Sequence, residues 1–194
     1  MIQDTSRWRM PWWPLLITLL PTLLLAAGVK HVDHRHWTDR YDRHFKKYSK
    51  HYFGAGFDWR WFKAQAIAES GLRPTAKSSV GAKGLMQIMP ATFEEIREAN
   101  PHFRSVDDPK WNIAAGIYYD RQLYRRWSEH IKGKERLNFA FGSYNAGFGN
   151  VRKAYRKAEK KDRQVLSWKQ VAGFAPGQTR HYVRRINKLM LKEQ

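Results

Sequence analysis

Residues 58–92 read DWRWFKAQAIAESGLRPTAKSSVGAKGLMQIMPAT, the pattern of a helix followed by a glycine-punctuated loop. Asp58 is a residue type favoured at a helix N-cap, and apolar side chains follow it at helical spacing. A helix is therefore predicted from Asp58 to the Ser70-Gly71 pair. Beyond it, glycine and proline break the helical period, and Leu85–Met89 predicts one short extended segment. Pro90 suits the first turn of the next helix.

The remainder of the chain shows helical periodicity again. Helices are predicted over residues 90–99, 111–127, 137–144 and 151–161, and from near residue 178. The segment 151–161 is sharply two-faced, because its apolar residues fall on one helical face and six Lys or Arg cover the rest. These patterns predict a small, mainly α domain.

Composition limits the classes of function. The 194 residues carry a formal charge of +19, and 42% of them are apolar, which is enough to bury a core. Because the chain has no cysteine, disulfides, cysteine-ligated zinc, iron–sulfur clusters and thiol nucleophiles are excluded. Residues 121–194 hold 19 Lys and Arg against five Asp and Glu, so most of the charge lies there. Such an excess predicts a polyanionic partner: nucleic acid, anionic lipid or an acidic polymer.

The N-terminal segment has the composition of an export signal. Arg7 and Arg9 precede a run without charges over residues 10–29. The run is also close to the minimum length for crossing a bilayer, so residues 1–29 are interpreted as a cleaved signal peptide or as an uncleaved membrane anchor. Either one places the remainder on the periplasmic or cell-wall side of the cytoplasmic membrane.

Residues 30–54 are basic and rich in histidine, and a solvated linker is predicted for them. Three histidines and Asp33 could suggest a metal site, but their spacing matches no zinc signature. No metal and no cofactor is expected. The three histidines are His31, His34 and His36.

Glu69 is the candidate catalytic residue. On a helix it shares a face with Phe62, Gln65 and Ala66, and it falls in the last turn, at the negative end of the helix dipole. Burial and the dipole both disfavour the anion, so both raise the carboxyl pKa toward the range that a general acid needs. Helix geometry alone leaves open an ordinary, solvent-exposed glutamate.

Other polar residues have weaker indications. In an extended Leu85–Met89 segment, Leu85, Gln87 and Met89 would share one side, and Gln87 is interpreted as a sugar ligand or as the capped amide of a structural turn. Three further acids that could supply a second carboxylate are expected at a helix entry or on a solvated helix surface. They are Asp107, Asp108 and Asp120.

Together, four ordered blocks resemble the catalytic domain of the soluble lytic transglycosylase (SLT) family. The first joins Glu69-Ser70-Gly71 to SSVGAKGLMQIMPAT at residues 78–92, and the second has Asn112-Ile113 with Gly116 and Tyr118-Tyr119. The third is YNAGFGNV at residues 144–151, and the fourth is TRHYV at residues 179–183. The resemblance covers about residues 55–190.

This resemblance implies a lysozyme-like domain of the goose type that cleaves the MurNAc–GlcNAc bond of peptidoglycan. The family's glutamate, here Glu69, would protonate the glycosidic oxygen and then take the proton of the MurNAc C6 hydroxyl, leaving 1,6-anhydro ends. One carboxylate then suffices, whereas ordinary glycosidases need two. Tyr182 would position Glu69 or the substrate. Lining of the sugar cleft is implied for Ser78, Gln87, Met89, Tyr144 and Asn145.

One position departs from the family pattern. Many members have a glutamate immediately before the Thr-Arg of the last block, where this chain has Gln178. A charged substrate contact is therefore in doubt at this point, and one candidate second carboxylate is absent.

Three alternatives to an exported lytic transglycosylase are weighed. A peptidoglycan-binding or scaffold protein on the same fold would have no need of a buried Glu69. A nucleic-acid binder using the basic helix is disfavoured by the export segment, so no nucleic acid is expected as a partner. A lysozyme-like hydrolase is separated from the transglycosylase by the resemblance alone. The expected partners are peptidoglycan strands, with an anionic membrane or wall polymer on the basic C-terminal third.

Overall fold

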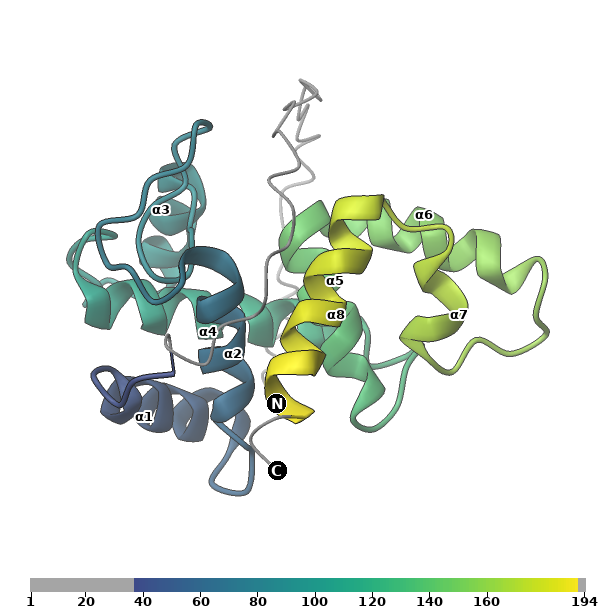
Figure 1. Ribbon diagram of the computed structural model, residues 1–194, viewed down its shortest axis with the longest axis horizontal. Coiled ribbons are helices and arrows are strands. Elements are labelled where there is room, and N and C mark those ends of the chain that lie inside the picture. The colour runs from purple at the N-terminus through teal and green to yellow at the C-terminus, as the bar shows by residue number, and fades with distance from the viewer. Residues whose placement is uncertain (1–36, 192–194) are drawn as a thin grey trace, which may run out of the picture. The chain divides into compact units, whose positions relative to one another are not determined.

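The computed structural model describes residues 37–191 (Figure 1). This part of the chain is mainly helical, as predicted, and its only β-type pairings are isolated bridges between Lys77 and Lys83 and between Lys83 and Ile88. None of its helices is long and apolar enough to cross a membrane. The helices are α1 (Asp42–Phe53), α2 (Arg60–Ser70), α3 (Pro90–Ala99), α4 (Pro109–Arg126), α5 (Glu135–Ala146), α6 (Phe148–Glu159), α7 (Trp168–Ala172) and α8 (Gly177–Leu191).

Helix α2 is the central element of the domain. Its middle is buried on all sides, since Phe62, Ala64 and Ala66 have no exposed surface. The helix begins at Arg60 with Trp59 at its N-cap, so the predicted N-cap Asp58 lies one residue earlier, where its Oδ1 accepts the Arg60 backbone N–H at 3.0 Å. Figure 1 shows α2 and α8 side by side, with α1 and α3 on one side of them and α6 and α7 on the other. The C-terminal end of α2 therefore meets the last helix of the chain.

Helix α1 corrects the prediction of a linker over residues 30–54. Phe45 and Tyr48 are buried in the common core, and the helix packs against α4 and α2. Lys63 of α2, itself buried, forms an ion pair with Asp42 at 2.6 Å. The basic composition hid an apolar stripe at helical spacing. This stripe consists of Tyr41, Phe45, Tyr48 and Tyr52. Residues 30–36 and the predicted export segment at 1–29 lie outside the described residues.

Helix α7 was not predicted from the sequence. Ser167 and Gln170 form a capping box that starts it, and Glu135 of α5 accepts the Trp168 backbone N–H at 2.9 Å. The Trp168 ring lies directly on Gly142, where a Cβ atom would be 2.6 Å from it. Five residues are too few for a helical period to be visible, so the capping box was the only local signal for this helix.

Candidate active site

The glycine loop between α2 and α3 is fastened by one side chain of α4. Asn112 Oδ1 accepts the Met86 N–H at 2.8 Å, and Asn112 Nδ2 donates to the carbonyls of Lys83 and Val106, both at 2.9 Å. Gly84 has φ +74°, and a Cβ there would be 2.4 Å from Asn112 Nδ2. Both the backbone conformation and the close approach therefore require glycine at this position.

Two further helices hold the same loop. Ser70, the last residue of α2, donates through Oγ to the Leu85 carbonyl at 2.8 Å. Tyr144 of α5 donates its hydroxyl to the Met86 carbonyl, also at 2.8 Å. The loop is thus bound to three helices next to the C-terminal turn of α2, which carries Glu69.

The predicted extended segment at Leu85–Met89 is wrong. Gln87 has φ +47°, a left-handed conformation that interrupts the alternation of a strand. Leu85 is consequently buried, whereas Gln87 is half-buried and Met89 is 40% exposed. The two N–H groups of the Gln87 amide donate to the carbonyls of Ala76 at 3.1 Å and Gly84 at 2.9 Å, as a capped turn requires. Its Oε1 is the atom left for a ligand.

Glu69 lies in the last turn of α2, as predicted, and receives a hydrogen bond from α8. The Tyr182 hydroxyl donates to Glu69 Oε1 at 2.6 Å. Burial raises the pKa of Glu69 to about 7, while the Tyr182 hydrogen bond and the positive charge of Arg185 oppose part of that rise. Arg185 itself donates to the Ala68 carbonyl at 3.1 Å. The carboxyl group therefore changes its protonation state close to neutral pH.

A cavity of about 340 Å³ opens beside this carboxyl. Its lining comes from the end of α2, from the turn that follows and from α8. The lining residues are Ala68, Glu69, Ser70, Gly71, Arg73 and Arg185. Glu69 is accordingly enclosed enough to be desolvated and open enough to meet a ligand.

Asp120 is the site residue that the sequence interpretation missed. It was expected on a solvated helix surface, but it has no exposed area and lies against α2, where Gln65 Nε2 donates to its Oδ1 at 3.3 Å. Burial raises the pKa of Asp120 well above its usual range, and the nearby Glu69 raises it further. A signal was present, since Asp120 continues the buried face of Ile113 and Ile117 at helical spacing.

The other predicted residues differ in their relation to the carboxyl. Tyr144 lies close enough to Glu69 and Asp120 for their charges, added to its burial, to raise its own pKa well above the usual range. Ser78 lies on the loop, where its Oγ accepts the Ala82 N–H at 3.0 Å. Asn145 Oδ1 accepts the Thr179 hydroxyl at 2.9 Å and so connects α5 to α8. The structure brings Tyr182 into direct contact with Glu69, whereas the hydrogen bonds of Ser78, Gln87 and Asn145 go to other groups. Among residues 37–191, no three His, Asp or Glu side chains gather as a metal site would require.

Comparison with known proteins identifies the fold. The chain is 31% identical over 153 residues to the membrane-bound lytic murein transglycosylase F of Maricaulis maris, and the alignment covers 75% of this chain and 32% of that protein. The 70 kDa soluble lytic transglycosylase SLT70 of Escherichia coli superposes with a TM-score of 0.65 at 28% identity, covering 80% of this chain and 24% of that one. An inactive Glu-to-Gln mutant of the lytic transglycosylase Slt of Pseudomonas aeruginosa superposes with a TM-score of 0.65 at 25% identity, covering 78% of this chain and 23% of that one.

The chain thus spans about a third or less of the length of these relatives. The family described as the transglycosylase SLT domain matches residues 46–167, which include the second half of α1, the glycine loop and Glu69. The match covers more than half of the chain and the whole of the glycine loop. The chain therefore belongs to the transglycosylase SLT domain family.

Proposed function

We propose that this domain is a lytic transglycosylase, which cleaves the MurNAc–GlcNAc β-1,4 bond of peptidoglycan and leaves 1,6-anhydro-MurNAc ends. The observation that carries the proposal is the Glu69 carboxyl at a cavity, with a pKa of about 7 and a hydrogen bond from Tyr182. A carboxylic acid that is partly protonated at neutral pH is what a general acid needs.

The geometry assigns one role to each carboxyl oxygen. Because Tyr182 donates to Oε1, the acid proton is carried by Oε2. Glu69 transfers this proton to the glycosidic oxygen as the C1–O bond breaks, and the GlcNAc leaves as an alcohol. The resulting carboxylate takes the proton of the MurNAc C6 hydroxyl, whose oxygen closes on C1. Glu69 is protonated again at the end of the cycle, and no water is consumed.

Asp120 favours this mechanism over hydrolysis with two carboxylates. An inverting glycosidase needs a second carboxylate that activates water, and a retaining one needs a second carboxylate as nucleophile. Asp120 is near Glu69, but it has no exposed surface and is hydrogen-bonded to Gln65, so neither water nor sugar reaches it. A lysozyme-like hydrolase remains the alternative enzyme, and a scaffold without activity is the alternative outside enzymes.

The sugar cleft is proposed to run along the loop. Five residues around it would contact the glycan, four through polar side chains and one through an exposed thioether. These are Ser78, Gln87, Met89, Tyr144 and Asn145. Gln87 would act through its Oε1, since its amide N–H groups are engaged by the turn.

The substitution Glu69→Gln tests the proposed activity. We expect it to abolish glycan cleavage with the fold intact, in keeping with the inactive Glu-to-Gln mutant of the Pseudomonas enzyme. Glu94→Gln is the matched control, because Glu94 lies on the exposed side of α3 and pairs with Arg97. Mass spectrometry of products from purified peptidoglycan separates the mechanisms: anhydro-muropeptides support the transglycosylase, and reducing ends support the hydrolase. Cleavage by Glu69→Gln would refute the assignment.

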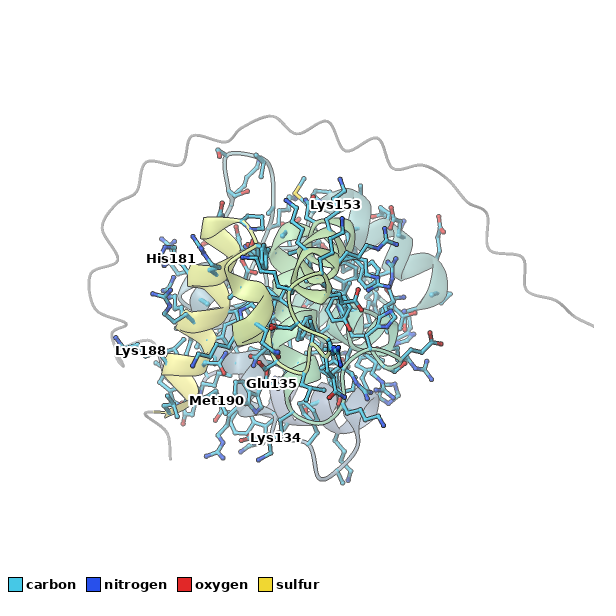
Figure 2. All side chains as sticks on the ribbon, turned by 90° about the vertical axis from the view of Figure 1, so that its right-hand side faces the viewer. Lys134, Glu135, Lys153, His181, Lys188 and Met190 are labelled. Carbon is cyan, nitrogen blue, oxygen red and sulfur yellow. The ribbon has the colours of Figure 1, made fainter. Side chains whose placement is uncertain are left out.

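The exposed face of α6 is proposed to contact an anionic wall polymer or membrane on the periplasmic or cell-wall side. Val151, Ala154, Tyr155 and Ala158 are buried, which leaves Lys153, Arg156 and Lys157 in solvent. Figure 2 shows Lys153 of α6 and Lys188 of α8 at the outer surface.

Replacing three basic residues of α6 by glutamine should weaken sedimentation with insoluble peptidoglycan at low salt, where charges are least screened. The replaced residues are Lys153, Arg156 and Lys157. A triple replacement of equal charge on α1 is the control and should have less effect. Its residues are Lys46, Lys47 and Lys50, which are also exposed. Equal losses in the two triple variants would contradict a specific role of α6.

A further inference from the structure

Behind Glu69, two polar side chains from different helices meet in the core. Gln65 of α2 and Asp120 of α4 have no exposed surface, and Gln65 Nε2 lies 3.3 Å from Asp120 Oδ1. The second oxygen of each group, Gln65 Oε1 and Asp120 Oδ2, is also buried, and neither has a hydrogen-bond partner among the described residues. The contact therefore leaves two buried acceptors on adjoining groups.

Counting donors shows what would satisfy both atoms. An ionised carboxylate and an amide oxygen are both acceptors, so neither can supply the missing hydrogen. Buried polar atoms are nearly always hydrogen-bonded, and a fully buried charge without compensation is costly. One proton on Asp120 Oδ2 would resolve both deficits, because it turns that oxygen into a donor for Gln65 Oε1.

We propose that Gln65 and Asp120 form a neutral acid–amide pair with two antiparallel hydrogen bonds, which keeps the second carboxyl group behind Glu69 uncharged. Gln65 Nε2–H donates to Asp120 Oδ1, and Asp120 Oδ2–H donates to Gln65 Oε1. The proton stays on Asp120 throughout the reaction. Gln65 and Asp120 are therefore positioning residues and do not touch the substrate.

The surroundings of the pair favour the neutral form. The titratable groups that interact with Asp120 are Glu69 from α2, Tyr119 from α4 itself, Tyr144 from α5 and Tyr182 from α8, and each is neutral or negative. The nearby cation, Arg185 of α8, interacts with Glu69 and donates to the end of α2. Burial raises the pKa of Asp120 above its usual range in the same direction.

A neutral pair has a consequence for Glu69, which follows Gln65 by one helical turn on the same face. When Glu69 gives its proton to the leaving oxygen, its negative charge develops without a like charge behind it. A charged Asp120 would disfavour that carboxylate and raise the pKa of Glu69 further. This consequence rests on the proposed function of Glu69 as general acid, whereas the protonation of Asp120 does not.

The direct test is carbon NMR of the complete domain labelled with ¹³C at the aspartate carboxyl carbons. The Asp120 signal is assigned by its loss in Asp120→Asn. We expect its shift to stay at the value of a protonated acid from about pH 5 to about pH 8, where ordinary aspartates are ionised. A transition to the ionised value within that range would overturn the proposal. This result is independent of glycan cleavage, so it separates failure of the pair from failure of the proposed function.

A swap of the two groups provides the second test. Gln65→Glu places two acids together, so above neutral pH the pair gains a negative charge and the alkaline limb of the pH–activity profile should rise by about one unit. Gln65→Glu combined with Asp120→Asn rebuilds a neutral pair with the acid on α2, and the limb should return to within about 0.3 units of the parent. Asp120→Asn alone forms an amide–amide pair and should also leave the limb within about 0.3 units.

Two outcomes of the swap would contradict the neutral pair. A limb lowered by about one unit in Asp120→Asn would mean that a negative charge had been removed, which contradicts the neutral pair. A double variant no closer to the parent than Gln65→Glu would do the same. Thermal melts of each variant show whether it folds, and the NMR measurement on the parent decides the question where one does not.

Discussion

The hydrogen bond from Tyr182 to Glu69 sets the acidity of the proposed catalytic group, and Tyr182→Phe removes it while keeping the ring. The Tyr182 hydroxyl lies 2.6 Å from Glu69 Oε1, and its donation stabilises the carboxylate more than the acid. A hydrogen bond to a charged group contributes about 1.5–3 kcal/mol and one to a neutral group about 0.5–1.5 kcal/mol. The difference, roughly 1–1.5 kcal/mol, corresponds to about one pKa unit.

Tyr182→Phe should therefore raise the pKa of Glu69 by about one unit above its present value of about 7. Because the acid form is the active one in the proposed mechanism, we expect kcat/KM to fall as pH rises through this pKa. The alkaline limb of the profile should then move upward by about one unit, and the rate on the acidic plateau should fall about tenfold because the carboxylate formed is less stabilised.

The assay is release of soluble muropeptides from purified peptidoglycan, measured as initial rates across the pH range. Tyr118→Phe is the matched control, since Tyr118 also lies on a helix but contacts Tyr52 of α1. An alkaline limb that stays in place in Tyr182→Phe, or moves downward, would refute the reasoning that the tyrosine stabilises the carboxylate. A matching shift in the control would show that loss of any tyrosine hydroxyl has this effect.

Three more predictions concern stability and the loop. Glu69→Gln should stabilise the fold by up to about 3 kcal/mol at pH 8 and by almost nothing at pH 4. The reason is that the folded chain holds the Glu69 proton more tightly than the unfolded chain does. The stability that the parent gains from this bound proton is complete below the ordinary pKa of 4.5 and is lost as pH rises to about 7. Urea unfolding at both pH values measures it, and an equal difference at the two would contradict it. Phe45→Ala should cost about 3–5 kcal/mol in the same assay, because its ring is fully buried, and a loss under about 1 kcal/mol would mean that α1 is not part of the core. Asn112→Ala should cost about 2–4 kcal/mol and lower kcat, because it removes two hydrogen bonds that hold the glycine loop and a third to the Val106 carbonyl before α4. Parental kinetics in this variant would show that the loop does not need α4.

The helices that show a repeating apolar pattern could be predicted from the sequence. Helices α2, α3, α4, α6 and α8 were predicted close to their observed positions, because apolar residues every three or four positions mark the buried face of each helix. The same periodicity in α1 was overlooked, because its charged residues suggested a linker. Helix α7 has only five residues and no period to find.

The sequence by itself determined the family and the candidate acid. The four blocks indicate an SLT domain and mark Glu69 as its glutamate, and helical spacing places Glu69 in the last turn of a helix. Both are local properties of the chain, which is why they can be read without coordinates.

Only the tertiary structure decided the surroundings of that acid. The Tyr182 hydrogen bond joins residues 113 positions apart, and the Gln65–Asp120 contact joins residues 55 positions apart. Desolvation, which raises the pKa of Glu69, depends on which helices close around the carboxyl and on no neighbour in the chain. The left-handed turn at Gln87 likewise depends on carbonyls that its side chain reaches through the fold. The sequence pattern identifies Glu69, and the packing of helices distant in the chain raises its pKa to about 7.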